Sequence, residues 1–412
     1  MNHPRHNITS LKASLLLTGL ASTGTSVIWN GLPFIAKRDY DFSESENLSL
    51  YLLIGFVYVV GAITSGWCTR KLKTRISNRS IIATLLLVVA LACSLPLFDH
   101  GGRWVIWTAG AVAGFCSSWL WPIVESYLVV GRHGKEMRRA IGWWNLVWML
   151  SVAGSMLAMA PLMEEHASMV IVGLGVMNLA AIGVLPWYAK NPPKHDERIA
   201  TEHVPEGYRG LLNGARILLP LSYIMNGLLA PLLPFVFASI AIDIFWQTPV
   251  ASIWMFSRVL ITAFMWRSDR IPSGQAQVDT PQPPKGVRFM AGGWHGKWSV
   301  LWGALLTMAL GFICILSANS LVVLVVGLVL LGGAMGVTYY AALYYAMAVG
   351  QAKVDAGGKH EALIGSGYLI GPIVGLVSIE PSSTSFTAII YVVLAIMTIA
   401  TMTLAVFWRK AR

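Results

Sequence analysis

Long apolar runs separated by short polar segments dominate this chain and restrict what it can fold into. A run of about 20 apolar residues is enough to cross the ~30 Å hydrocarbon core of a membrane. Only 12% of the 412 residues are charged, against roughly 25% in an average soluble domain. Because so few charged residues cannot cover a water-exposed surface, we predict an all-α integral membrane protein embedded in a lipid bilayer.

Twelve of these runs have the length of a membrane-spanning helix. The first run exceeds the ~7–15 residues of the apolar core of a cleaved signal peptide, so we expect it to remain in the mature protein. The expected spans are 13–35, 48–67, 81–98, 104–130, 140–163, 167–187, 217–239, 244–266, 298–316, 321–348, 362–379 and 386–408.

The basic residues are distributed unevenly between alternate loops. If the N-terminus is cytoplasmic, 26 of the 30 Lys and Arg residues fall in inner segments, and only Lys37, Arg38 and Arg103 lie in outer loops. Inner loops of membrane proteins carry this excess of Lys and Arg, so we predict a multi-pass plasma-membrane protein with both termini cytoplasmic. The net charge of +11 is scattered among short loops, which does not favour a nucleic-acid partner.

A heptapeptide occurs twice in nearly the same form. Ser26–Leu32 and Ser222–Leu228 share five of seven residues. Each copy places Asn-Gly inside an apolar run, where Gly loosens a helix and the Asn amide needs a partner. The repeat predicts two six-helix halves. These are residues 1–187 and 217–412, joined by a cytoplasmic linker at 188–216, with a cytoplasmic insertion at 267–297 in the second half.

Twelve spans in a 6+6 repeat, with a long central loop and both ends inside, resemble the major facilitator superfamily of secondary transporters. In the family, the loop after helix 2 carries Gly followed by Asp-Arg. This chain has Arg70 at the Asp position, whereas the matching loop of the second half keeps Asp269 and Arg270. The resemblance implies the major facilitator fold, alternating access and a cavity lined by helices 1, 4, 7 and 10. It makes Asp269 and Arg270 candidates for gating.

Expected helix 11 carries several small residues and a proline. Gly365, Gly367, Gly371 and Gly375 recur at short intervals, and Pro372 follows the third of them. Small residues let helices approach closely, and Pro bends a helix. Gly371 and Pro372 are therefore expected either to serve tight packing or to act in gating where the halves move.

Two ionisable residues stand out inside the spans. Glu125 lies in expected helix 4. Placing an acid there costs roughly 2.5–3.5 kcal/mol, and neutralising it at pH 7 costs about 3.7 kcal/mol, from ~2.7 pH units at 1.36 kcal/mol each. Because these costs are comparable, Glu125 is a candidate for proton coupling; the alternative is a permanent charge bonded to Arg258 or to helix 5.

Arg258 lies in expected helix 8, nine residues before Arg267. Its guanidinium cannot be neutralised, and a span of ~13 Å to the helix end, at 1.5 Å per residue, exceeds its reach. It must therefore face protein or a wet cavity. It either binds an anionic group of the substrate, or pairs with Glu125, or forms a structural bond between helices.

Polar and aromatic residues on expected helices 1, 4, 7 and 10 are candidates for substrate contact. Aromatic rings suit a ring-bearing or amphipathic substrate, although Tyr and Trp also occur in interfacial belts and Asn can simply join helices. The candidates besides Glu125 and Arg258 are Trp29, Asn30, Trp121, Tyr223, Asn226, Tyr340 and Tyr344.

Other charged residues are interpreted as structural or gating groups. Glu136 and Glu361 precede expected helices 5 and 11, where negative charge favours the helix N-terminus, and His360 is expected at an interface. The four cysteines show no paired spacing, so we predict no disulfide, metal or cofactor.

The sequence favours one function class over several others. That class is a secondary transporter of a small organic solute, coupled to protons and acting as a monomer. A transporter-like sensor is the alternative, supported only by the insertion at 267–297. A membrane-embedded lipid-modifying enzyme would need a nucleophile, metal cluster or paired carboxylates near the membrane surface, which the sequence does not offer, and we predict no catalytic residues. An ATP-driven pump would need a phosphate-binding loop, which is also missing.

Overall fold

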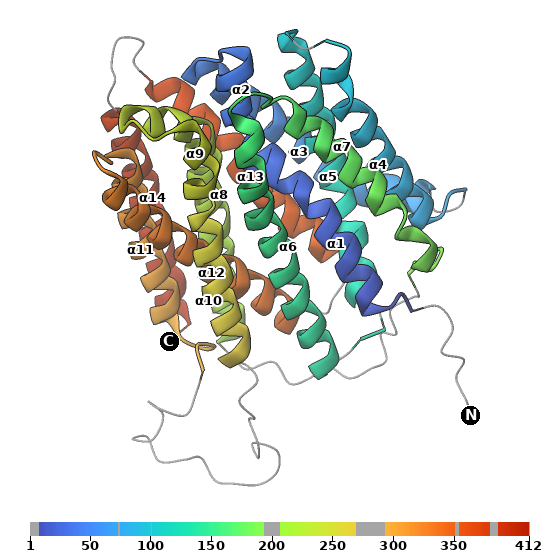
Figure 1. Ribbon diagram of the computed structural model, residues 1–412. Coiled ribbons are helices and arrows are strands. Elements are labelled where there is room, and N and C mark those ends of the chain that lie inside the picture. Colours follow the sequence, from blue (N-terminus) through green and yellow to red (C-terminus); the bar gives the residue numbers. More distant parts are fainter. Residues whose placement is uncertain are drawn as a thin grey trace, which may run out of the picture.

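The chain folds into a bundle of long helices (Figure 1). The computed structural model describes residues 8–72, 75–99, 101–129, 131–132, 134–192, 207–268, 293–350, 354–379 and 386–411. Within these ranges every regular element is helical. The all-α prediction is therefore confirmed.

The helices follow one another with short connections. They are α1 (Leu11–Ser26), the π-helical turn η1 (Val27–Gly31), α2 (Leu32–Tyr40), α3 (Glu44–Leu72), α4 (Asn78–Cys93), η2 (Leu95–Leu97), α5 (Arg103–Val129), α6 (Gly134–Met163), α7 (Met169–Ile182), η3 (Leu185–Trp187), α8 (Tyr208–Ser239), α9 (Ile244–Ala251), α10 (Ile253–Ser268), α11 (Trp298–Leu316), α12 (Leu321–Gly350), α13 (Val354–Ser378) and α14 (Thr387–Lys410).

Eleven helical stretches in the described residues are long and apolar enough to cross a membrane. Each of them overlaps one of the twelve spans expected from the sequence. The remaining expected span corresponds to α5, which has 27 residues. Trp, Ser and Gly residues lower the hydropathy of α5, but it packs within the same bundle against α3 and α4.

Local sequence signals explain where several helices begin and end. Ser10 accepts a hydrogen bond from the Ala13 N–H at 3.2 Å and so caps the start of α1. At the end of α5, Arg132 donates to the carbonyl oxygens of Leu128 and of Thr9, the latter at 2.8 Å. Arginine there satisfies carbonyl groups that a helix C-terminus leaves free. It also ties the α5 terminus to the segment that precedes α1.

Figure 1 shows that α1 begins and α14 ends at the same end of the bundle, which we call the terminal end. Helix α8 lies deepest, since 89% of its most apolar window is buried, against 28–50% for the other membrane-length helices. It packs against α3, α11, α12, α13 and α14. The second copy of the heptapeptide therefore lies on the most enclosed helix.

Helix α13 packs closely on two other helices. It contacts α3, from before the central loop, and α8, from after it. Gly371 lies so near α8 that a Cβ atom there would sit 2.5 Å from the Ile224 carbonyl oxygen and 2.8 Å from the Leu228 nitrogen. The structure therefore places Gly371 in the tight packing that is one of its two expected roles.

Replacing Gly371 by alanine should lower stability. The obstructing atoms belong to the α8 backbone and cannot move aside, so we expect a cost of about 1–3 kcal/mol, measured as a lower unfolding temperature in detergent. Gly154→Ala in α6 is the matched control, because no atom lies within 4 Å of a Cβ there. An unchanged unfolding temperature for Gly371→Ala would contradict the close approach.

Candidate functional site

The first copy of the heptapeptide departs from α-helical geometry. Residues Val27–Gly31 form a π-helical turn, in which the Leu32 N–H bonds to the Val27 carbonyl. The Tyr51 hydroxyl donates to the Ile28 carbonyl oxygen at 2.9 Å, and the Asn30 amide donates to the Thr25 carbonyl at 3.4 Å. Side chains thus satisfy carbonyl groups that the wider turn displaces.

Removing the Tyr51 hydroxyl should destabilise this turn. Tyr51 is fully buried, so Tyr51→Phe leaves one bond of the Ile28 carbonyl unmade at a cost of about 1–3 kcal/mol. We expect a lower unfolding temperature, whereas Tyr391→Phe, at a residue that is 68% exposed, should have no effect. Equal unfolding temperatures for the two variants would show that the hydroxyl is dispensable.

The second copy remains α-helical within α8 and meets the first copy through Tyr368 of α13. The Asn226 amide donates to the Tyr368 hydroxyl at 3.1 Å, and the Tyr223 ring lies 5.1 Å from the Tyr368 ring. On the other side, Trp29 stacks on Tyr368 with ring centroids 3.8 Å apart. One tyrosine therefore lies between the two copies of the repeat.

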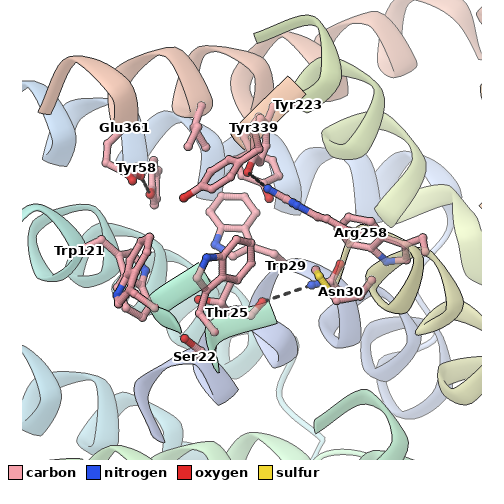
Figure 2. A pocket seen from close by; sticks show the side chains of 16 residues that line it. Ser22, Thr25, Trp29, Asn30, Tyr58, Trp121, Tyr223, Arg258, Tyr339 and Glu361 are labelled. Carbon is pink, nitrogen blue, oxygen red and sulfur yellow. Dashed lines mark hydrogen bonds between the residues drawn. The ribbon is translucent and has the colours of Figure 1, made fainter. Parts of the chain in front are cut away.

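A cavity opens beside this stack and encloses about 590 Å³ between atoms, including space open to solvent. Figure 2 shows its side chains converging from several helices. Nine of the sixteen lining residues are aromatic, so the walls suit a flat apolar group. The cavity is lined by Ser22, Thr25, Trp29, Asn30, Tyr58, Trp121, Trp144, Trp148, Tyr223, Trp254, Met255, Arg258, Tyr339, Glu361, Ile364 and Tyr368.

Arg258 enters this cavity from α10 and is only 1% exposed. Its guanidinium donates to the Tyr223 hydroxyl at 3.1 Å. The guanidinium carbon also lies 4.8 Å from the centroid of the Trp148 ring and 4.6 Å from that of Tyr339. Of the three roles expected for Arg258, a bond between helices is present, and within the described residues the pairing with Glu125 is not.

Two carboxyl groups lie at the other side of the site. The Tyr58 hydroxyl donates to the Glu361 carboxylate, and Figure 2 shows this pair across the cavity from Arg258. Glu125 of α5 is partly buried, its Oε1 atom is buried without a hydrogen-bond partner, and it lies near enough to Glu361 for the two charges to interact. The site therefore combines one cation with two acids that come from helices far apart in the sequence.

The structure brings most of the candidate residues together. Trp29, Asn30, Trp121, Tyr223 and Arg258 line the cavity. Asn226 instead lines a smaller neighbouring cavity, which it shares with Asn30.

Tyr340 and Tyr344 do not reach the central cavity, which corrects their expected placement. Their rings pack against Trp294, with centroids 5.7 and 5.0 Å apart, and the preceding residue Tyr339 lines the cavity instead. One residue is about 100° of helix rotation, so Tyr339 and Tyr340 lie on different faces of α12. The proposed gating pair Asp269 and Arg270 lies outside the described residues.

Sequence reasoning also missed several site residues. Glu361 was expected just before a span, but α13 begins at Val354, so Glu361 lies inside the helix and is 5% exposed. Glu125 is therefore not the only acid deep in the bundle. The resemblance implied a cavity lined by expected helices 1, 4, 7 and 10, which correspond to α1 with η1, α5, α8 and α12. Residues of α3, α6, α10 and α13 line the cavity as well. Trp144 and Trp148 of α6 are two of the missed residues. Their spacing of four places both on one face of the helix and could have marked them as site residues.

Comparisons with known proteins agree with this architecture. Residues 14–274 match the family model of the Major Facilitator Superfamily. Two crystal structures of the nucleoside transporter NupG, one of them a mutant, superpose with TM-scores of 0.65 and 0.64 at 12% and 11% identity, and cover 97% of this chain and 100% and 99% of theirs. The comparison with curated proteins gives no match.

A third structure is a bacterial homologue of the human lysosomal transporter Spinster in an inward-facing, occupied conformation. Its TM-score is 0.58 at 14% identity, with 97% of this chain and 96% of that chain covered. The bundle of long apolar helices defines a multi-pass membrane protein. More particularly, this chain belongs to the Major Facilitator Superfamily.

Proposed function

We propose that the protein is a secondary active transporter that moves one small organic solute by alternating access and uses the proton gradient as its driving force. Family membership supports transport in general. One observation supports coupling to protons: Glu361 lines the cavity, Glu125 lies within electrostatic range of it, and no basic group pairs with either acid among the described residues. Intramembrane acids of this kind are the usual carriers of coupling protons.

Alternating access requires two bodies that separate at one end of the bundle at a time. We propose that the segments before and after the central loop, 1–187 and 217–412, are these bodies. They touch at the terminal end, where the rings of Trp143 and Trp266 lie 5.3 Å apart. They also touch at the opposite end, where Lys37 donates to the Pro234 carbonyl at 2.9 Å. If the terminal end is cytoplasmic, as the distribution of basic residues predicts, the cavity lies between an inner and an outer contact.

Transport by the purified protein tests this proposal directly. Proteoliposomes with an acidic exterior would be incubated with a mixture of sugars, carboxylates, amino acids, nucleosides and cationic drugs, and their contents measured by mass spectrometry. Nucleosides are included because NupG is a nucleoside transporter. We expect at least one solute to accumulate above its external concentration and to be lost when a protonophore is added. Accumulation that is unchanged by the protonophore would contradict proton coupling. The absence of any protein-dependent flux would contradict transport.

A further inference from the structure

The Arg258 side chain carries a charge that the described part of the protein does not balance. Arginine keeps its proton under all physiological conditions, and Arg258 is 1% exposed. Among the described residues its one hydrogen-bond partner is a neutral hydroxyl, that of Tyr223, and its Nε atom is buried without a partner there. Burying an unpaired charge is costly, so an arginine kept in this state indicates an anion that is present only part of the time.

The acids of the site do not supply that anion. No carboxylate among the described residues forms an ion pair with Arg258. Glu361 already accepts a hydrogen bond from Tyr58, on the side of the cavity away from Arg258 (Figure 2). Glu361 and Arg258 thus line different sides of the same cavity (Figure 2).

The surroundings of Arg258 select the shape of the anion. The centroids of the Trp148 and Tyr339 rings lie within 5 Å of the guanidinium carbon and only 5.6 Å from each other, so the two rings do not enclose the guanidinium between them, and Arg258 still lines the cavity. A guanidinium edge matches a carboxylate through two parallel hydrogen bonds. Beyond it, the stacked rings of Trp29 and Tyr368 offer a flat apolar surface. The two nearby acids would repel a ligand that carried a second negative charge.

Building on the proposed transport function, we propose that the substrate is a ring-bearing monocarboxylate. Its carboxylate binds the edge of Arg258, assisted by the Tyr223 hydroxyl, and its ring packs against the aromatic wall that includes Trp29 and Tyr368. Binding pairs the buried guanidinium with an anion. An uncharged or cationic ring compound lacks this contribution.

Ring-matched probes test the assignment. Calorimetric titration of the purified protein would compare benzoate, benzamide and benzylammonium, and the same three head groups on an indole ring. We expect each carboxylate to bind about tenfold or more tightly than its amide, as a charge-assisted hydrogen bond predicts. In Arg258→Gln this preference should vanish, and in Tyr223→Phe it should shrink. Arg103→Gln, at an exposed ion pair with Glu46, is the control that should keep the full preference.

The carboxylate site and the transport function can fail independently of each other. Amides or ammonium compounds that bind as tightly as carboxylates would overturn the carboxylate site, as would a preference that survives in Arg258→Gln or the absence of carboxylate binding at millimolar concentration. If such probes or a nucleoside were nevertheless transported, the transporter proposal would stand without this site. Carboxylate binding without any flux in proteoliposomes would uphold the site and reject the transporter proposal. If Arg258→Gln fails to fold, Tyr223→Phe alone decides the result.

Discussion

Proteoliposomes containing Glu125→Gln should exchange solute across the membrane and yet fail to accumulate it against a gradient. Glutamine keeps the size of the side chain and most of its hydrogen-bonding ability, but it cannot bind or release a proton. We expect the accumulation ratio to fall to about 1, the value at equilibrium, if transport is coupled through this group. The measurement compares uptake driven by an imposed pH gradient with counterflow in the same vesicles.

Glu361→Gln should have the same effect, because the two carboxyl groups act on each other. Two ionised acids in a low-dielectric interior repel, so the protonation of one changes the cost of ionising its neighbour. A double variant should then be no worse than either single variant, which is the behaviour of groups that work as a unit. Glu46→Gln is the control, since Glu46 is exposed and pairs with Arg103 instead. Wild-type accumulation in both single variants would rule out coupling through this pair.

The proposed mechanism places the two acids and Arg258 in complementary roles. A monocarboxylate at Arg258 is disfavoured while Glu125 and Glu361 are both ionised, because the ligand adds a third negative charge to a cavity with one cation. Protonation of an acid removes that repulsion. Solute and proton are therefore expected to enter and leave together, which is the energetic requirement for symport.

The sequence predicted the helices and five of the sixteen residues that line the cavity, for reasons that individual residues show. Apolar runs fix spans well because the bilayer sets their length, and a polar residue inside a run, such as Asn30 or Arg258, is conspicuous against that background. Both of these residues line the cavity. The duplicated heptapeptide likewise drew attention to Trp29 and Tyr223 on expected helices 1 and 7, and both contact Tyr368.

Other parts of the site depend on packing, which single-sequence patterns do not carry. Glu361 was not recognised as a residue inside the bundle, because α13 begins before the apolar run from which the span was predicted. Tyr339 and Tyr340 are adjacent residues of one type, and only the packing of α12 decides which of them faces the cavity. The π-helical turn at Val27–Gly31 has no counterpart in the second copy of the heptapeptide, so the sequence similarity itself concealed it.

Replacing Arg258 by methionine should raise the unfolding temperature of the ligand-free protein. Methionine fills similar space between Trp148 and Tyr339 and makes favourable contacts with aromatic rings. It also removes a buried charge that no carboxylate balances. Exchanging buried charged groups for well-packed apolar ones has stabilised other proteins by about 1–4 kcal/mol, so we expect a rise of a few degrees, measured by differential scanning calorimetry in detergent.

Arg258→Lys and Arg103→Met complete this experiment. Lysine keeps the charge but loses the planar contacts with both rings, so its ligand-free form should unfold below the wild type. Arg103→Met breaks only an exposed ion pair, which contributes little to stability, and should leave the unfolding temperature unchanged. If Arg258 instead served chiefly to join helices through Tyr223, methionine would leave that hydroxyl without its donor and the ligand-free protein would lose stability. The sign of the change for Arg258→Met therefore decides whether the arginine is retained for stability or, at the expense of stability, for binding an anion.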